Sequence, residues 1–596
     1  PLGPNRDFKI DKLTFGNLDD PKVYELIAAA ETDGVFQLES SGFKEMLRRL
    51  KPDHFDDIIA GVALYRPGPL DAGMVEDYIA RKHGKQEITY PHPVCEPILR
   101  STYGVIVYQE QVMRIAVDMC GLSMGKADKL RKAMGKKKAD VMAELREQFV
   151  KGALDTSGMP EKEAGELFTQ IEKFAGYAFN KSHSAAYAVI TYQTAFLKSY
   201  FPVEFMAALM SAEMRNQDEV VKYIGSSRER GIEILPPCVN NSECDFSVVR
   251  DAEGKGCILF GLGAVKGLGE AAIDAILEAR QDGDFASIYR FCERVDLKRI
   301  NRKVLDVLVK SGAFDCFGKP RAQTFAVIER ALEAGQTAHR DRASGQTNLF
   351  EAFAASTGSG DASSTVQETY PDLEEWFEKK KLAAEKEALG FYVSGHPLDG
   401  YVRDLPRLCS ASTASIASMV GQPGMRYNEI AIGGVITAMR ERPLKSGKGR
   451  MAFLTLEDLH GRCEVIVFSK VFKEYEAILK SDEPVLIRGA LQTEGDDGTE
   501  VRLRATAIES LSEARAQRAR RFDLSIPVYA LNNDRLVQLK ELLIANKGNV
   551  PTRLTVTKPD VFETVIALPE TLRVNPTDEL LVRVDQLFGQ KVVRLA

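Results

Sequence analysis

The spacing of apolar residues divides the chain into a first part of helices and a later part rich in strands. Up to about residue 240, apolar side chains recur every three or four positions, as in helices that bury one face. The spacing is clearest over residues 141–151 and 182–214, where we expect helices. Pro236 and Pro237 then end the helical pattern, because proline has no backbone N–H to donate.

Shorter elements follow between about residues 240 and 390. Residues 240–350 mix one short pair of strands with several short helices. Residues 355–365 are poor in apolar side chains and rich in glycine and serine, which predicts a flexible linker. After it we expect a charged helix over residues 372–389 and a turn at residues 394–397.

From residue 430 onward the pattern changes to the two-residue period of strands. Five segments alternate in this way: residues 430–437, 453–458, 463–468, 485–489 and 501–505. A helix over residues 473–479 separates the third from the fourth, which is the layout of an OB-fold barrel. The four arginines of residues 515–521 suggest a basic junction, and the last ~75 residues predict a small α/β unit. The fold class is therefore multidomain α+β.

Composition narrows the class of protein. The 79 Lys and Arg residues against 85 Asp and Glu give a net charge of −6, so any nucleic-acid binding must come from local patches. The nine cysteines form no C-x2-C pair, which argues against structural zinc and for free thiols in a reducing cytoplasm. No apolar run approaches the ~18 residues of a membrane span, and the N-terminus does not resemble a signal peptide. Because the chain lacks an initiator Met, we expect a fragment.

The densest basic segment lies between residues 126 and 138. It contains Lys126, Lys129, Arg131, Lys132, Lys136, Lys137 and Lys138, opposed by Asp128 alone. On a helix, Arg131 and Lys132 would share a face with Lys129 or Lys136 and bring several cations to one phosphate. A solvated helix face remains an equal alternative. We expect Gly135 to break the helix here, which favours a turn that presents cations to an anion.

A second candidate for phosphate binding precedes the helix expected from residue 182. Asn180, Lys181 and His183 lie where a helix N-terminus attracts anions. Ser182 or Ser184 is better explained as an N-cap than as a nucleophile. His183 has no carboxylate or cysteine at the spacing of a metal motif, so we expect no metal there.

Residues 265–276 fit a helix-hairpin-helix. Lys266, Gly267 and Gly269 would let backbone N–H groups approach a phosphate without reading its sequence. Ile273 stands where that motif usually has a small residue, and a simple packing corner between helices remains open.

Two further segments suggest binding. Gln346, Leu349 and Phe350 lie beside the linker, where an exposed amide and two apolar side chains could anchor in a hydrophobic pocket. In the barrel, basic residues surround the first hairpin loop before an aromatic residue, which suits single-stranded nucleic acid. These residues are Arg440, Arg442, Lys445, Lys448, Arg450 and Phe453. A merely soluble loop is the alternative.

The acidic residues of the first part could suggest a two-metal site. They are Asp19, Asp20, Asp53, Asp56 and Asp57. Because both groups precede expected helices, we interpret them as helix caps instead. The chain has no GxGxxG, Walker or Ser-His-Asp pattern, so we assign no catalytic residue and no metal ligand.

Several strings in a fixed order carry a family resemblance that covers essentially the whole chain. The chain resembles the C-terminal half of the bacterial DNA polymerase III alpha subunits, the C-family replicative polymerases. The strings are Gly34-Val-Phe-Gln-Leu-Glu-Ser40, Arg66-Pro-Gly-Pro-Leu70, Tyr108-Gln-Glu-Gln-Val-Met113, Ala133-Met-Gly-Lys-Lys-Lys138, Phe179-Asn-Lys-Ser-His-Ser184 and Ser394-Gly-His-Pro-Leu398.

The resemblance implies five regions. They are polymerase fingers (1–240), a helix-hairpin-helix and clamp-binding domain (241–352), a linker with a connecting helix (353–425), an OB-fold (426–510) and a domain that docks the clamp-loader tau subunit (511–596). A clamp motif together with such a C-terminal domain resembles the replicative form more than the error-prone relatives. The absence of a zinc-type cysteine cluster argues against the Gram-positive sister enzyme.

The resemblance also implies residue roles. Arg131 and Lys132 match a fingers pair that meets the triphosphate of the incoming nucleotide. The family commonly has two arginines there, and a lysine cannot make the same bidentate contact. Gln346, Leu349 and Phe350 match the internal motif that binds the beta sliding clamp. The implied ligands are primer–template DNA and deoxynucleoside triphosphates in a bacterial cytoplasm, with no membrane.

In this family the palm, with its metal-binding aspartates, lies upstream of the fingers, and nothing in this chain matches it. In the intact enzyme two Mg²⁺ ions would align the primer hydroxyl with the nucleotide. The proofreading exonuclease subunit would bind through the domain upstream. We therefore expect a piece of a DNA-directed DNA polymerase, a nucleotidyltransferase, that is inactive alone. The alternative is a complete, non-enzymatic scaffold that binds DNA and the clamp.

Overall fold

A computed structural model describes most of the chain. The described residues are 18–136, 139–174, 179–251, 253–343, 368–419, 430–443, 449–481, 483–494, 500–558 and 561–596. They form two compact units, one of Pro1–Ala264 with Leu268–Leu277 and one of Val265–Gly267 with Glu278–Ala596. No helix among the described residues is long and apolar enough to cross a membrane. All nine cysteines are free thiols, as predicted.

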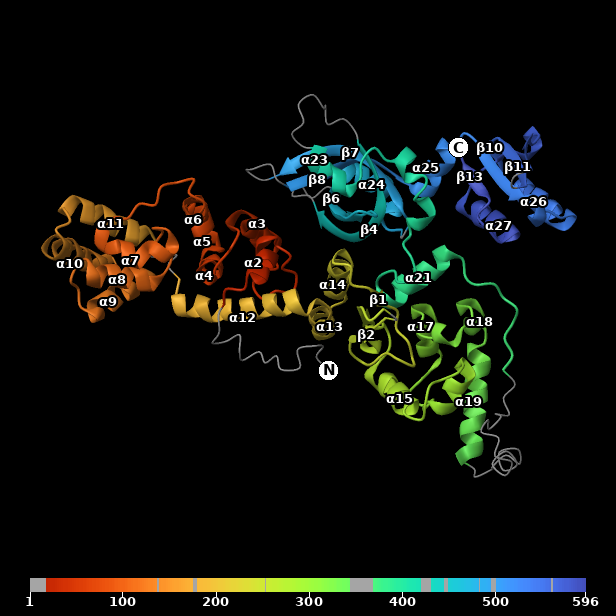
Figure 1. The fold of residues 1–596 in the computed structure, drawn as a ribbon, viewed down its shortest axis with the longest axis horizontal. Coiled ribbons are helices and arrows are strands. Elements are labelled where there is room, and N and C mark those ends of the chain that lie inside the picture. The colour runs from red at the N-terminus through yellow and green to blue at the C-terminus, as the bar shows by residue number, and fades with distance from the viewer. Residues whose placement is uncertain are drawn as a thin grey trace. The chain divides into compact units, whose positions relative to one another are not determined.

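The first unit is mainly helical up to residue 229, as predicted (Figure 1). Its helices are α2 (Pro21–Ala28), α3 (Ser41–Leu50), α4 (Phe55–Leu64), α5 (Pro67–Asp71), α6 (Met74–Lys82), α7 (Glu96–Leu99), α8 (Gln109–Asp118), α9 (Met124–Lys136), α10 (Ala139–Ser157), α11 (Glu161–Phe174), α12 (Lys181–Tyr200), α13 (Pro202–Ala212) and α14 (Gln217–Glu229). The 3-10 turns η1 (Pro93–Cys95) and η2 (Arg100–Thr102) flank α7.

Two hydrophobic cores organise these helices. Tyr24, Ile59 and Tyr192 belong to a core that joins α2, α4 and the middle of α12. Phe149 and Phe168 belong to a separate core that joins α8, α9, α10 and α11. In Figure 1 the helices of the second core gather near the first end of α12, while α2 and α4 lie along its length. The segment that leads into α12 therefore lies where the two cores meet.

The helix expected over residues 182–214 is two helices. Phe201 leaves the helical conformation with φ −132° and ψ 56°, and Pro202 begins α13. Because proline cannot donate a hydrogen bond to the preceding turn, it starts a new helix more readily than it continues an old one. The helical spacing expected over these residues is confirmed, and Pro202 divides it into two helices.

A small sheet closes the first unit. The strands β1 (Ile234–Leu235), β2 (Ser247–Arg250) and β3 (Gly256–Leu259) have the order β1-β3-β2. The expected strand pair corresponds to β2 and β3, which are antiparallel, and β1 adds a parallel partner to β3. The turn η3 (Leu262–Ala264) and helix α15 (Glu270–Arg280) follow.

The second unit begins with α16 (Ile288–Arg294), α17 (Arg302–Ser311), η4 (Asp315–Phe317), α18 (Arg321–Ala326), α19 (Ile328–Ala343) and α21 (Glu378–Leu389). The helix expected over 372–389 starts only at Glu378. The Glu375 carboxylate accepts the backbone N–H groups of Arg321 and Ala322, at 3.0 and 3.2 Å. These bonds hold the segment before Glu378 against the start of α18, so this segment does not form part of the helix.

The predicted OB-fold is confirmed as a closed barrel of five strands. After η5 (Asp399–Tyr401), α22 (Leu405–Leu408) and α23 (Thr413–Met419) come β4 (Ile430–Pro443), β5 (Arg450–Glu457), β6 (Arg462–Val467), α24 (Ser469–Leu479), β7 (Val485–Glu494) and β8 (Glu500–Ser510). The order is β4-β5-β6-β8-β7, and β4 pairs with β7 to close it. Alternate residues such as Ile432, Leu454 and Leu503 fill the interior.

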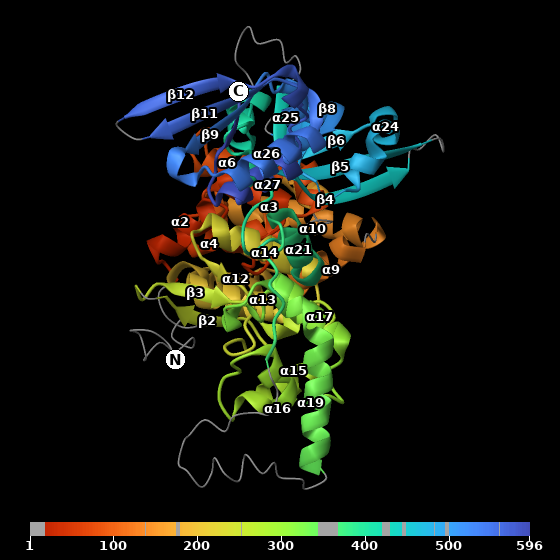
Figure 2. The ribbon, with the colours of Figure 1, turned by 90° about the vertical axis from the view of Figure 1, so that its right-hand side faces the viewer.

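The last part is a small α/β unit, as predicted (Figure 2). Its elements are α25 (Leu511–Arg518), β9 (Phe522–Pro527), η6 (Val528–Ala530), α26 (Asn533–Ala545), β10 (Lys547–Val550), β11 (Thr552–Lys558), β12 (Phe562–Ala567), η7 (Glu570–Leu572), α27 (Asp578–Phe588) and β13 (Val593–Leu595). A four-stranded sheet has the order β12-β11-β9-β13. The core of this unit contains Phe522 of β9, Leu543 of α26 and Val584 of α27.

At the expected basic junction, residues 515–521, one of the four arginines makes an internal connection. The Arg515 side chain is buried and bonds to Asp578, at the start of α27. It also donates to the Gly400 carbonyl at 3.2 Å and covers the Tyr401 ring at 4.6 Å. Arg515 therefore joins the segment before the barrel to the C-terminal sheet, and it is not a free cation.

Candidate functional site

A two-stranded backbone contact links the beginnings of α8 and α12. Tyr108 and Phe179 form a parallel bridge, in which the Phe179 N–H donates to the Val107 carbonyl at 3.1 Å. The Gln109 N–H donates to the Phe179 carbonyl at 2.9 Å. We call this contact the 108–179 bridge. It places side by side two segments that are far apart in the sequence, residues 108–113 and 179–184.

The first turn of α12 is capped by protein groups. Asn180 is the N-cap, and its Oδ1 accepts the His183 N–H at 2.9 Å. The Lys181 N–H donates to Glu110 Oε2 at 2.9 Å. The expectation that Ser182 or Ser184 caps this helix was wrong, since the asparagine one turn earlier fills that position. Because these N–H groups already have acceptors, an anion at this end of α12 would have to be bound by side chains.

Two cations lie over aromatic rings at the 108–179 bridge. The Lys181 Nζ is 5.3 Å from the Tyr108 ring centroid and 3.8 Å from Asp56 Oδ1. The Arg66 guanidinium is 4.8 Å from the Phe179 ring centroid. Arg66 was not among the predicted site residues, although it opens one of the strings that carry the family resemblance. Stacking on a ring restricts where each charge can point.

The predicted Arg131 reaches the same region through Gln109. Its Nη1 donates to Gln109 Oε1 at 3.4 Å, while its Nε and Nη2 bond to Asp128 at 3.0 and 2.8 Å. The Lys132 Nζ is 2.7 Å from the same carboxylate, and its side chain is mostly exposed. The ammonium of Lys132, followed by the guanidinium of Arg131, lowers the pKa of Asp128. Asp128 is thus the present counter-ion of both predicted cations.

The expected break of the helix at Gly135 was wrong. Helix α9 continues through this glycine to Lys136, because one glycine costs a helix only about 1 kcal/mol. The side chain of Lys136 and the residues Lys137 and Lys138 lie outside the described part of the chain. The cations of this segment are therefore presented by a helix up to Lys136.

The His183 ring belongs to an aromatic group. Its centroid lies 4.4 Å from that of Tyr187 in a stacked arrangement and 5.4 Å from that of Phe179. Among the described residues it belongs to no cluster of potential metal ligands.

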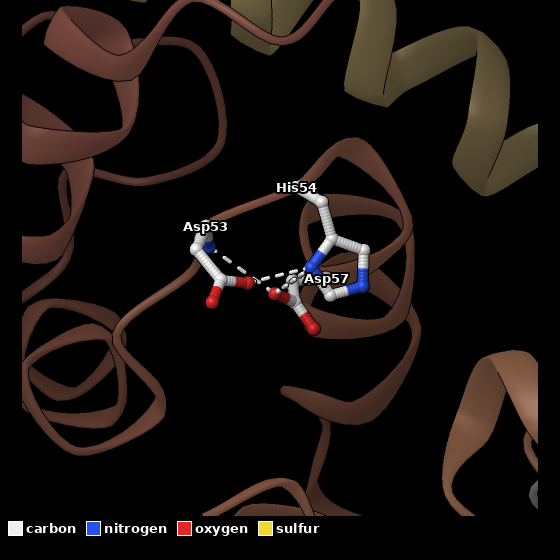
Figure 3. Close-up of side chains that lie close together, drawn as sticks. All are labelled: Asp53, His54 and Asp57. Carbon is white, nitrogen blue, oxygen red and sulfur yellow. Dashed lines mark hydrogen bonds and ion pairs between the residues drawn. The ribbon is translucent and has the colours of Figure 1, made fainter.

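One group among the described residues has the spacing of a metal site, namely Asp53, His54 and Asp57 (Figure 3). Its centre is already occupied by the Lys82 ammonium, which is 2.6 Å from both Asp53 Oδ1 and Asp57 Oδ2. Hydrogen bonding to Asp57 raises the pKa of His54 to about 9, so the imidazole is protonated at neutral pH. A metal ligand must be a neutral imidazole. These residues therefore do not fit Mg²⁺.

The acids of this region have structural roles. Asp57 is fully buried and also accepts the Tyr78 hydroxyl at 3.2 Å. Asp20 caps α2, as predicted, by accepting the Lys22 N–H at 2.9 Å. Asp53 is not a cap, since His54 occupies that position of α4. Asp56, in the first turn of α4, is the acid that faces Lys181.

Three segments of this chain match known protein families. Residues 4–157, which include α8 and α9, match a family model described as the bacterial DNA polymerase III alpha subunit finger domain. Residues 231–324 match a helix-hairpin-helix motif, and residues 430–511 match an OB-fold nucleic acid binding domain. The DNA polymerase III alpha subunit of Pseudomonas aeruginosa is 40% identical over 98% of the chain. Along nearly its whole length the chain is similar to DNA polymerase III alpha subunits.

Other alpha subunits of this family show the same relation. That of Vibrio cholerae is 39% identical and that of Escherichia coli K12 is 38% identical, each over 97% of the chain. The alignments cover 50% of the Pseudomonas subunit and 49% of each of the other two. The chain thus spans about half the length of the curated relatives that it matches.

In this chain the helix-hairpin-helix candidate has only a short 3-10 turn, η3, before its loop. Gly267 has φ +82°, a conformation that favours glycine, whereas a Cβ at Gly269 would meet open space. The Lys266 N–H is not available to a phosphate, because it donates to the Ala388 carbonyl at 2.9 Å. Ile273 is buried as a core residue.

The barrel presents its predicted basic residues on a two-stranded extension of β4 and β5. Arg440 pairs with Phe453 and Arg442 with Met451, and the Arg442 guanidinium is 5.3 Å from the Phe453 ring centroid. Arg450 is 3.1 Å from Glu441. Lys445 and Lys448 lie outside the described residues. A second pair was missed, in which Arg504 of β8 lies 5.7 Å from the Phe468 ring centroid.

The predicted clamp motif is not part of this geometry. Gln346, Leu349 and Phe350 lie outside the described residues.

Proposed function

We propose that this chain is part of a replicative DNA polymerase alpha subunit, which carries out template-directed DNA synthesis from deoxynucleoside triphosphates. The observation that carries the proposal is the 108–179 bridge, which brings cations of α9, α12 and the α5 segment to one region of a chain related to alpha subunits along 98% of its length. The parent would be a DNA-directed DNA polymerase in the bacterial cytoplasm.

In this proposal the triphosphate of the incoming nucleotide is bound by Arg131, Lys132, Lys181 and Arg66. Arg131 and Lys132 would exchange the Asp128 carboxylate for phosphate oxygens. Arg131 can bind two oxygens at once, whereas Lys132 acts as a single point charge. His183 and Asn180 support this group from the start of α12.

The DNA would be held by sequence-independent contacts. We propose that the segment around Gly267 and Gly269 approaches the duplex backbone, and that Arg440, Arg442 and Phe453 of the barrel bind single-stranded template. Both kinds of contact suit a polymerase, which must move along any sequence.

We propose that the Mg²⁺ ligands of the parent enzyme are palm aspartates outside this chain. The support is that the one described group with metal spacing holds Lys82 and a protonated His54 in its place. No step of the reaction is assigned to Asp53, His54 or Asp57.

The remaining proposals concern domains and partners. We propose fingers over 1–240, a helix-hairpin-helix and clamp-binding domain over 241–352, a connecting region over 353–425, an OB-fold over 426–510 and a partner-docking domain over 511–596. The beta sliding clamp would bind at Gln346, Leu349 and Phe350, and the clamp-loader tau subunit at the last domain. The exonuclease subunit would bind upstream of this chain.

Primer extension tests the central proposal. The purified chain is given a labelled primer–template, Mg²⁺ and all four nucleotides, and DNA binding is measured in parallel. We expect bound DNA without extension. Template-dependent extension would place metal-binding carboxylates in this chain and contradict the proposal, and a failure to bind DNA would contradict the assignment of DNA grip.

Clamp binding is tested separately. We expect the double substitution Leu349→Ala with Phe350→Ala to abolish association with the sliding clamp while DNA affinity stays unchanged. Thr347→Ala with Asn348→Ala, between the same anchors, is the matched control and should bind normally. Equal clamp binding by both variants would remove this motif from the proposal.

A further inference from the structure

Exposed apolar side chains are concentrated in the C-terminal sheet unit. Of the twenty-one large hydrophobic residues that are exposed among the described residues, ten lie between residues 528 and 582. They are Val528, Tyr529, Leu536, Val537, Ile544, Val561, Phe562, Val565, Ile566 and Val582. Single exposed apolar residues are ordinary, but a concentration in one small region indicates an interaction surface.

Four of these ten residues lie in strand β12 or directly before it. All six residues of β12 are exposed, although three of them are Phe562, Val565 and Ile566. Because Leu554 pairs with Ile566 and Lys558 with Phe562, the latter two side chains continue the face on which Leu554 is buried. Val565 projects from the opposite face. Both faces of the strand are therefore apolar and uncovered.

The apolar surface extends past the beginning of β12. Strands β9 and β11 are parallel, with Pro527 opposite Thr557, so η6 follows β9 at the same end of the sheet where β12 starts. There Tyr529 is 78% exposed and Val561 is 64% exposed. Tyr529, Val561 and Phe562 thus lie at one end of the sheet, and β12 leads away from them.

Strand β12 is also an open edge. It is the last strand in the order β12-β11-β9-β13, and Figure 2 shows it as the outermost strand on its side. Proteins usually protect such edges with lysine, proline or a bulge. β12 pairs with β11 in unbroken register over six residues, contains no lysine or proline, and carries Glu563 as its one charge. The opposite edge, β13, is three residues long and contains Arg594.

We propose that β12 is the docking strand for an extended segment of a partner protein, which adds a fifth strand to this sheet. The inference rests on the proposed function, in which the last domain binds a partner. It identifies β12 as the part of that domain that the partner contacts. The partner segment would alternate apolar side chains and place a lysine or arginine opposite Glu563. Tyr529 and Phe562 would cover one end of it.

Charge decides between the possible occupants. DNA or RNA does not fit, because β12 offers no cation to a phosphate and its one charge is a carboxylate. A second copy of this chain fits poorly, because β12 contains no basic residue and cannot offer a cation to Glu563 in any register. A strand of another protein that contains a lysine or arginine needs no cation from β12 and can place its own cation opposite Glu563.

The test uses the whole chain and the purified clamp-loader tau subunit, the partner named by the proposed function. Amide hydrogen exchange is followed in the unmodified chain, alone and with tau. We expect exchange over residues 562–567 to slow at least tenfold on binding, since a new strand bonds the open edge. If tau binds and exchange in β12 is unchanged, the inference is overturned while partner docking stands. If tau does not bind, both are overturned.

Two variants test the charge requirement. Glu563→Lys should weaken tau binding at least tenfold, because the substitution brings two cations together. Glu570→Lys is the matched control, since Glu570 is on the same unit, highly exposed and paired only locally with Arg573, and it should bind as the unmodified chain does. Equal affinity of the two variants would contradict the inference. Slower exchange in β12 with rising concentration of the chain alone would assign the edge to a second copy instead.

Discussion

Among the described residues, two of the predicted basic regions, at the 108–179 bridge and on the barrel, hold their cations differently. At the bridge, Lys181 lies over Tyr108 and near Asp56, and Arg131 is bonded to Asp128 and Gln109. On the barrel, Arg440 and Arg442 are exposed on a two-stranded extension. A prearranged set of charges suits a ligand of fixed size such as a triphosphate. Exposed charges suit a polymer that binds in many registers.

The largest expected effect is a loss of stability when the buried acid Asp57, near the 108–179 bridge, is removed. Asp57 is buried against Lys82, His54 and Tyr78 at the start of α4, the helix that carries Asp56. Asp57→Ala removes the buried carboxylate and leaves the buried Lys82 ammonium only the exposed Asp53 as a partner, so we expect the first unit to lose about 3–5 kcal/mol of stability. Urea unfolding followed by amide exchange in α4 and α12 measures this loss.

Asp53→Ala is the control for that experiment. Asp53 contacts the same Lys82 and His54, but its side chain is 72% exposed. We expect a loss of less than about 1 kcal/mol, as for other exposed ion pairs. Equal losses of stability for the two variants would mean that the burial of Asp57 does not stabilise the region around α4.

The next largest effect concerns the nucleotide. Arg131→Ala should weaken binding of a deoxynucleoside triphosphate by about tenfold to a hundredfold, since a charge-assisted bond contributes about 1.5–3 kcal/mol. Arg131→Lys should recover part of the loss. Equilibrium dialysis in the presence of primer–template measures the affinity. Arg114→Ala, an exposed residue of α8 paired with Asp118, is the control, and an equal loss there would show a general charge effect.

A smaller effect is expected on the barrel. Arg442→Ala removes one exposed cation beside Phe453, and because a single exposed charge pair contributes at most about 1 kcal/mol, we expect single-stranded DNA binding to weaken about two- to fivefold. Fluorescence anisotropy with a labelled oligothymidine measures this affinity, and Arg462→Ala on β6 is the control. A loss as large as that expected for Arg131 would mean that the barrel cations are also prearranged.

The smallest effect is a dependence on pH. The folded-state pKa of His54 is about 9, above its ordinary value of 6.5. The stabilisation by the protonated imidazole is therefore complete below about pH 6.5 and is lost as the pH rises through about 9. Because His54 is half exposed, we expect a change of about 1 kcal/mol at most. Thermal unfolding of the His54→Gln variant should lack this slope, and an unchanged slope would assign it to another group.

The parts of the fold that could be predicted depend on neighbours in sequence. The five strands of the barrel follow from their two-residue period, and four of them, β4, β5, β7 and β8, are longer in the structure because pairing extends past the apolar pattern. The cations Arg131 and Lys181 could be identified from local charge and from the approach to a helix. In each case the sequence pattern that supports the prediction lies within one helical turn or one strand.

What could not be predicted depends on contacts between distant residues. Glu110 accepts the N–H of Lys181, 71 positions later, and Glu375 holds its segment extended through bonds to Arg321 and Ala322. Arg66 enters the site only because Phe179 is folded beside it. No periodicity within a segment indicates such partners. The sequence could therefore identify the parts of the candidate site but not their arrangement.

The first described helix, α2, depends on one that is made much later. The Asp20 N–H donates to the Tyr192 hydroxyl, and α2 packs against α12 across 172 positions. At the usual rate of about 5–20 residues per second, synthesis of that interval takes on the order of ten to thirty seconds. During that time Val23 and Ile27 have no α12 to cover them. We expect this part of the chain to need protection from chaperones on the ribosome, and to fold only once α12 has emerged.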